Sequence, residues 1–198
     1  TEAVYKVLDH TEQKAVIPGH FQKHELDAVW SDFSYMDVFE QLLALMENFE
    51  LCYQLPDNKE EYIVPQLLFS DKPEYEWSDS DQLRLHYKYT FMPKGIVTRL
   101  IVRLHSMIAE QATVWQRGAI FKLDGARAEV SERFRDKEIH IKVKGENRKE
   151  LMTIITHEID LINSTFDFGE RLRVAQKIPC NCADCIGKVE PYFFEKQV

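Results

Sequence analysis

Before residue 80, apolar side chains recur at the spacing of one helix face in three segments, residues 2–8, 23–30 and 35–49. Residues 50–55 and 61–65 then flank a Pro-Asp-Asn-Lys sequence. Its proline, aspartate and asparagine favour a turn, so the two segments predict a β-hairpin. Three helices followed by a two-stranded ribbon are in the order of a winged helix. We therefore predict a winged-helix-like first half.

After residue 80 the pattern changes to an alternation of apolar and polar positions. Residues 83–91 alternate with a period of two and predict a strand. Residues 96–108 carry apolar residues four apart and predict a helix. The remaining expected elements are strands at residues 114–123, 126–134 and 139–143, with a tight turn at Asp124-Gly125, and a second long helix at residues 148–166. The predicted fold class is α+β, with a helical subdomain followed by a mixed or antiparallel sheet and two long helices.

Charge divides the chain at the same place. Residues 1–80 contain five lysines, no arginine and 17 acids, whereas residues 81–198 contain 20 basic and 16 acidic residues. The net charges are −12 and +4, and together they give the −8 of the whole chain. So abrupt a change predicts two subdomains, an acidic one at 1–80 and an α+β one at 81–198.

The acidic balance argues against nucleic acid or an anionic membrane as the main partner. The third predicted helix, which would enter a DNA groove, carries Asp37, Glu40 and Glu47 and no basic residue. No apolar run approaches the roughly 18 residues of a membrane span. The chain opens at Thr1 without the basic and apolar regions of a signal peptide. We therefore expect part of a larger cytoplasmic protein.

Catalytic and nucleotide-binding motifs are not found in the sequence. None of the seven glycines begins a Gly-x4-Gly-Lys-Ser/Thr loop, whose backbone N–H groups cradle phosphate. His157-Glu158 resembles part of a zinc-protease motif, but Leu161 replaces the second histidine. His20 and His24 fall in a predicted loop and are expected to be solvated. We predict no catalytic residue, no GTP site and no cofactor.

Several segments, in shared order and spacing, resemble the COR domain of Roco proteins, the module that directly follows the Ras-like Roc GTPase domain. In the second half these are Tyr89 to Leu104, Val114 to Ile120 and Ile178 to Cys185. Thr1 to Leu8 and Leu45 to Tyr53 are similar to the first half of that family. Nearly the whole chain is covered. The cysteine-containing end is similar to prokaryotic members and not to the leucine-rich-repeat kinases.

The resemblance implies a split module with two tasks. The first half is expected to be a winged-helix-like subdomain that packs on the Roc domain of the same chain. The second half, residues 81–198, is expected to be the main surface of a homodimer. Nucleotide binding and turnover belong to the Roc domain, and dimer contacts made through COR influence them. The chain itself is then non-catalytic, and its parent protein is a GTPase.

Six residues are candidates for contacts with a partner. Arg99 and Arg103 lie four apart on a predicted helix, so their like charges repel unless acids elsewhere neutralise them. An opposing subunit is one source of such acids, and solvation with snorkelling stems is the alternative. The other candidates are Trp115 and Arg117, of residue types that anchor interfaces, and Tyr75 and Trp77 at the subdomain boundary. We expect Tyr75 and Trp77 to wedge the two halves together rather than to face the GTPase domain, because large aromatic residues in loops usually need burial.

A zinc-bound tail is the basis of an alternative function. Cys180, Cys182 and Cys185 have C-x-C-x2-C spacing, and without a secretion signal free thiols are favoured over disulfides. Three thiolates could hold zinc, but the nearby sequence offers no fourth ligand. We predict unligated thiols in this segment and leave open a ligand beyond Val198. The alternative is an acidic winged-helix protein-binding adaptor with a zinc-bound tail.

Overall fold

The computed structural model describes residues 2–13, 18–31, 39–78, 81–166, 172–180, 182–185, 188 and 191–195. Its first half is built in the order α1 (Glu2–Glu12), β1 (His20–Gln22), α2 (Glu25–Val29), α3 (Phe39–Asn48), β2 (Tyr53–Leu55) and β3 (Asn58–Ile63). The three strands form an antiparallel sheet in the order β1-β3-β2. The helices enclose an apolar core that includes Val7, Leu26 and Met46.

The three predicted helices and the hairpin of the first half are present, with differences at their ends. The part of the predicted third helix at residues 35–38 lies outside the described residues. The strand β1 was not predicted, because three residues are too few to show an alternation of apolar and polar positions. The second hairpin strand begins at Asn58, earlier than expected, because the turn is tight.

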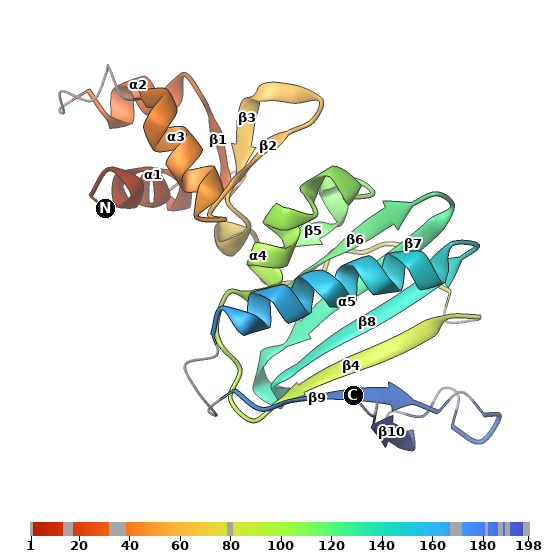
Figure 1. Cartoon of the computed structure of the whole chain (residues 1–198). Helices are drawn as coiled ribbons and strands as arrows, with labels where there is room; N and C mark the ends of the chain where they lie inside the picture. The colour runs from red at the N-terminus through yellow and green to blue at the C-terminus, as the bar shows by residue number, and fades with distance from the viewer. Residues whose placement is uncertain are drawn as a thin grey trace.

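The second half is a seven-stranded antiparallel sheet with two helices (Figure 1). Its elements are β4 (Leu83–Tyr89), α4 (Ile96–Arg103), β5 (Val114–Trp115), β6 (Gly118–Leu123), β7 (Ala126–Arg133), β8 (Glu138–Gly145), α5 (Arg148–Ser164), β9 (Val174–Pro179) and β10 (Phe193–Glu195). The strand order is β10-β9-β4-β8-β7-β6-β5. The predicted α+β class is confirmed.

One face of this sheet packs on the helices. Leu85, Tyr87 and Tyr89 point into the main core, where α5 crosses the sheet (Figure 1). Tyr87 donates a hydrogen bond to Asp160 Oδ1 at 3.0 Å, and Tyr89 donates one to Asn163 Oδ1 at 3.2 Å. The alternation read from the sequence thus corresponds to the face that binds α5.

Three predictions for the second half need correction. The helix expected to reach residue 108 ends at Arg103, and a 3-10 turn follows at His105–Met107. The strand expected over residues 114–123 is a hairpin, β5 and β6, that turns at residues 116 and 117. Strands β9 and β10 extend the sheet where no strand was predicted: β9 pairs with β4, and the three-residue β10 pairs with β9. Among the described helices, none is both long and apolar enough to cross a membrane.

Candidate functional site at the junction of the two halves

Acidic and basic side chains from both halves meet at the junction. Glu50, which follows α3, accepts hydrogen bonds from the Nε atoms of Arg99 and Arg103 on α4, the latter at 2.6 Å. Arg103 also donates to Glu158 Oε2 on α5 at 3.0 Å. We call Glu50, Arg99, Arg103 and Glu158 the Glu50 clamp. Glu50 from the first half and Glu158 on α5 together therefore neutralise the arginine pair on α4.

The clamp is partly shielded from water. The side chain of Glu50 is 18% exposed, and those of Arg99 and Arg103 are 24% and 26% exposed. Arg99 also donates to Thr165 Oγ1 at 2.7 Å and lies over the ring of Phe166. From the sequence, we considered a partner chain as one possible source of acids for these arginines. In the structure, acids of the same chain bind both arginines.

Apolar contacts close the junction beside the clamp. Tyr53 and Ile63, from the strands of the first half, belong to the main core of the second half. The ring of Tyr53 stacks on His105 with centroids 5.3 Å apart, and its hydroxyl donates to Gln111 Oε1 at 3.0 Å. Gln116 donates through its side chain to the backbone oxygen of Gln66 at 2.5 Å. The two halves thus share one apolar core.

Residues 69–78, the connector, run along the sheet face opposite α5. Glu129 on β7 is 4% exposed and points to this face, because its neighbours Ala128 and Val130 point into the main core. Its carboxylate accepts hydrogen bonds from Tyr75 at 2.7 Å and from Lys72 at 2.9 Å. Burial and the adjacent carboxylate raise the pKa of Tyr75. These bonds fasten the connector to the second half.

The aromatic candidates pack within the chain. Trp115 is 3% exposed, and its ring centroid lies 6.3 Å from that of Tyr75. Trp77 donates to Gln82 Oε1 at 3.1 Å and lies under the ammonium of Lys144. Arg117, in the turn between β5 and β6, is exposed. The sequence favoured a wedge between the halves for Tyr75 and Trp77, whereas their contacts described here hold the connector on the sheet.

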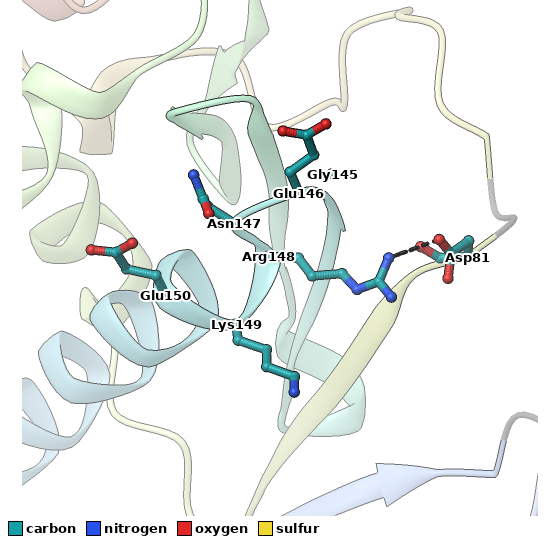
Figure 2. Close-up of a pocket in the computed structure, with 7 residues that line it drawn as sticks. All are labelled: Asp81, Gly145, Glu146, Asn147, Arg148, Lys149 and Glu150. Carbon is teal, nitrogen blue, oxygen red and sulfur yellow. Dashed lines mark hydrogen bonds and ion pairs between the residues drawn. The ribbon is translucent and has the colours of Figure 1, made fainter.

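A pocket of about 830 Å³ opens at the N-terminus of α5, but its lining does not suit an anion (Figure 2). Arg148 points to Asp81 and forms an ion pair with its carboxylate at 2.7 Å. Glu146 and Glu150 add negative charge to the same lining. With Arg148 and Lys149 as its basic residues, the lining has three acids against two bases, so its net charge disfavours phosphate.

The three C-terminal cysteines come together at the far edge of the sheet. The Sγ atoms of Cys180, Cys182 and Cys185 all lie within 4.8 Å of one another. Hydrogen bonds from the other two thiols lower the pKa of Cys182 to about 7. Cys52, by contrast, is fully buried in the first half, and burial raises its pKa to about 12.

A histidine pair lies on the connector side of the sheet. The rings of His86 on β4 and His140 on β8 stack with centroids 3.7 Å apart and an interplanar angle of 7°. His140 bonds to Glu138 at 2.7 Å, and Glu138 also pairs with Lys88. Parallel rings direct their in-plane lone pairs side by side and not toward one point, so this pair suits packing better than metal binding.

This pair makes stability depend on pH. Burial, followed by the neighbouring His140, lowers the pKa of His86 from 6.5 to about 3, so the unfolded chain binds more protons between these values. Stability is then complete above about pH 6.5 and decreases as the pH falls toward 3. Because His86 is partly exposed, we expect a loss of about 1–2 kcal/mol. Urea unfolding at a series of pH values measures it.

The variant His86→Phe keeps a ring in the stack and removes the titrating group, so its stability should change less over this range. The matched control is His157→Gln, at an exposed position on α5. If the profile of His86→Phe coincides with that of the unchanged chain, the assignment to His86 is wrong.

The fold and the junction define a class of protein, a two-part α+β module whose halves are joined by a shared core and an ion-pair cluster. Comparison with known families places it further. Residues 1–68 match the family described as C-terminal of Roc, COR-A domain, and residues 80–198 match C-terminal of Roc, COR-B domain. The chain therefore belongs to the COR domain family of Roco proteins, in which COR is a non-catalytic module adjacent to the Roc GTPase domain.

Two relatives come from Dictyostelium discoideum. The chain is 24% identical over 194 residues to the probable serine/threonine-protein kinase pats1, covering 91% of this chain and 6% of that protein. It is 22% identical over 143 residues to the probable serine/threonine-protein kinase roco5, covering 66% of this chain and 5% of that protein. The chain thus spans about one-twentieth of the length of these curated relatives.

The Glu50 clamp was missed by the sequence reasoning. The arginine spacing indicated that acids were needed, but no local signal identified Glu50, which lies 49 residues before Arg99. The partners of Tyr75 were equally hidden, since Glu129 lies 54 residues away. The positive φ of Glu50, +57°, marks it as the end of α3 but says nothing about its partners.

Proposed function

We propose that this chain is a non-catalytic coupling and dimerisation module of a Roco-type GTPase. In this proposal residues 1–80 are a winged-helix-like subdomain that packs on the Roc domain of the same chain, and residues 81–198 form a homodimer. The observation that carries the proposal is the Glu50 clamp, because it connects a helix of the first half to both helices of the second. A displacement of α3 by the Roc domain would thereby be passed to α4 and α5.

The order of elements in the first half supports the winged-helix-like assignment. Three helices and three strands follow one another in the order α1-β1-α2-α3-β2-β3, and the strands form one small antiparallel sheet. Helix α3 carries Glu40 and Glu47 and no basic residue, which weighs against DNA as its partner. Leu45 on α3, Phe49 directly after it and Tyr5 on α1 are exposed apolar residues that offer a protein-binding surface.

Coupling of this kind requires two arrangements of the halves whose contacts differ in free energy. The junction has the composition for such a change. The Glu50 clamp is partly exposed, so its ion pairs can exchange with water at modest cost. The shared core around Tyr53 and Ile63 keeps the halves in contact while the clamp rearranges. The nucleotide state of Roc would then shift the population of the two arrangements.

Of the three candidate arginines, Arg99 and Arg103 bind acids at the junction. The exposed Arg117 is therefore our candidate for the dimer surface. It lines a pocket of about 470 Å³ with Lys94, Glu132 and Phe134. Phe134 is 37% exposed. In a two-fold symmetric contact the same patch faces itself, so basic residues of one copy can meet Glu132 of the other. Arg99 and Arg103 serve the junction instead.

Sedimentation of the chain over a range of concentrations tests this part of the proposal. We expect a concentration-dependent dimer whose dissociation constant rises by roughly tenfold or more in Arg117→Glu, since like charges would then face Glu132. Lys122→Glu is the matched control, because Lys122 is an exposed cation on β6 outside this patch. A chain that stays monomeric at every concentration, or an Arg117→Glu variant that dimerises like the control, contradicts the assignment.

A further inference from the structure

The cysteine cluster at the edge of the sheet has the geometry of a metal site. We propose that Cys180, Cys182 and Cys185 bind one zinc ion, which fastens the loop between β9 and β10 to the sheet. In a tetrahedral site with Zn–S bonds of about 2.3 Å, ligand sulfur atoms lie about 3.8 Å apart. The three Sγ atoms, all within 4.8 Å of one another, need only small side-chain rotations to reach that spacing.

The backbone already holds the cysteines in place. Cys180 follows the last residue of β9, and its N–H donates to the backbone oxygen of Tyr192 at 2.7 Å. Arg84 on β4 donates to the Cys180 carbonyl oxygen at 3.1 Å. The first ligand is therefore anchored on both sides to the hairpin and the sheet. An unstructured tail would lose conformational entropy when it binds a metal. Here that entropy has already been lost on folding, so it does not oppose metal binding.

The other two cysteines sit on successive turns that direct their thiols toward the first. The N–H of Cys182 lies 3.5 Å from Cys180 Sγ, the kind of N–H···S contact that stabilises a thiolate ligand from outside the coordination sphere. The N–H of Cys185 donates to the Cys182 carbonyl oxygen at 3.0 Å, and that of Lys188 to the Cys185 carbonyl oxygen at 3.1 Å. Within the described residues, the cluster has three thiols, which leaves a fourth coordination position for water or another ligand.

Zinc fits this donor set better than other metals do. Thiolates are soft ligands that select Zn²⁺, Cu⁺ or iron–sulfur clusters over Mg²⁺ or Ca²⁺. In a 4Fe–4S cluster each cysteine binds a different iron, so the sulfur atoms spread around the cluster. Here the three sulfur atoms lie within 4.8 Å of one another, which is close to the spacing around a single ion. Cys182 and Cys185, in C-x2-C spacing, also match the close ligand spacing of structural zinc sites.

The site would stabilise a small and exposed part of the fold. Strand β10 has three residues and pairs with β9, and among described residues it has no second strand neighbour. Phe193 on β10 covers the ring of His86, with centroids 5.3 Å apart. Tyr192, Phe194 and Ile178 stay exposed on the same hairpin. Because this hairpin buries little apolar surface, it is only weakly held to the rest of the sheet. A metal bound at its loop would restrain it further.

Metal analysis of the whole chain, purified with reductant and without chelator, tests the proposal. We expect about one zinc ion per chain. After exchange with Co²⁺, the d–d bands of tetrahedral cobalt and the charge-transfer absorption of cobalt thiolate should appear, and added Zn²⁺ should abolish both. A chain that takes up neither ion, or that is isolated with copper in place of zinc, overturns the assignment.

Cysteine variants locate the metal. Cys182→Ser should lose both the zinc and the cobalt bands while α5 keeps its protection from hydrogen exchange, because the Cys182 side chain is exposed. Cys52→Ser is the matched control, since this thiol is buried in the first half and far from the cluster in the sequence; its zinc content should equal that of the unchanged chain. Zinc retained in Cys182→Ser, or a disulfide between two of the three cysteines in the reduced preparation, would falsify the proposal.

Removal of the ion tests its structural role. Chelation should accelerate hydrogen exchange at the amides of β9 and β10 and leave β6, β7 and β8 unchanged, because these central strands are held by neighbours on both sides. Exchange rates in β9 and β10 that do not respond to chelation would show that the metal does not hold this hairpin. Metal content and hydrogen exchange in β9 and β10 can both be measured whether or not the chain dimerises, and without a Roc domain.

Discussion

Replacing Glu50 by glutamine is expected to lower the free energy of unfolding by about 2 kcal/mol. The amide keeps the shape of the side chain but removes the charge that both arginines bind. Glu158 then remains beside Arg103, and it only partly offsets the repulsion between Arg99 and Arg103, four residues apart on α4. Breaking a fully buried ion pair costs about 3–5 kcal/mol, and the partial exposure of these three side chains reduces this value. Urea unfolding followed by circular dichroism measures the change.

The matched control is Arg148→Ala, which breaks the ion pair with Asp81. That carboxylate is 83% exposed, so we expect a loss below about 0.5 kcal/mol. In a protein that carries a Roc domain ahead of this chain, Glu50→Gln should also alter the rate of GTP hydrolysis, whereas Arg148→Ala should not. Equal stability losses in both variants would show that the Glu50 clamp does not hold the halves together. An unchanged hydrolysis rate would remove its role in coupling.

Gly118→Ala is expected to destabilise the second half by about 3 kcal/mol. A Cβ atom at this position would lie 2.3 Å from Trp115 Cζ2 and 2.3 Å from the backbone oxygen of Val130. Trp115 is buried, and the carbonyl belongs to the neighbouring strand β7, so neither can move without disturbing the sheet. Overpacking of this kind costs about 1–3 kcal/mol, and the backbone clash places Gly118 at the upper end. Thermal and urea unfolding check the value.

A glycine in open space supplies the comparison. Gly125 has φ +82° in the turn between β6 and β7, with nothing within 4 Å of an added Cβ. Asparagine tolerates this conformation, so Gly125→Asn should cost less than about 1 kcal/mol. A Gly118→Ala variant as stable as Gly125→Asn would mean that the hairpin of β5 and β6 relaxes without cost, contrary to the packing around Trp115.

Periodicity predicted the larger elements because it depends on neighbours in the sequence. The alternation of residues 83–91 and the four-residue spacing after Gly95 correspond to β4 and α4, whose apolar faces meet in the main core. Short strands were missed for the opposite reason. The three-residue strands β1 and β10 are defined by hydrogen bonds to partners elsewhere in the chain, and three residues carry too little pattern to reveal them.

The candidate residues divide in the same way. Their sequence spacing correctly placed Arg99 and Arg103 on one helix, and it grouped Cys180, Cys182 and Cys185 within one short segment. It could not tell that the arginines bind Glu50. Nor could it tell that Trp115 is covered by the chain itself while Arg117 remains exposed. Exposure depends on which segments pack together, and that depends on the whole fold.

The sequence by itself determined the α+β class, the acidic and mildly basic halves, and the family resemblance that the family comparison confirmed. The tertiary structure decided which charges meet at the junction, how the connector lies on the sheet, and how close the three thiols come. The physical reason is the separation along the chain over which each kind of interaction acts. Periodicity and composition act between neighbouring residues, whereas ion pairs and ligand clusters need groups that chain folding brings together from distant positions.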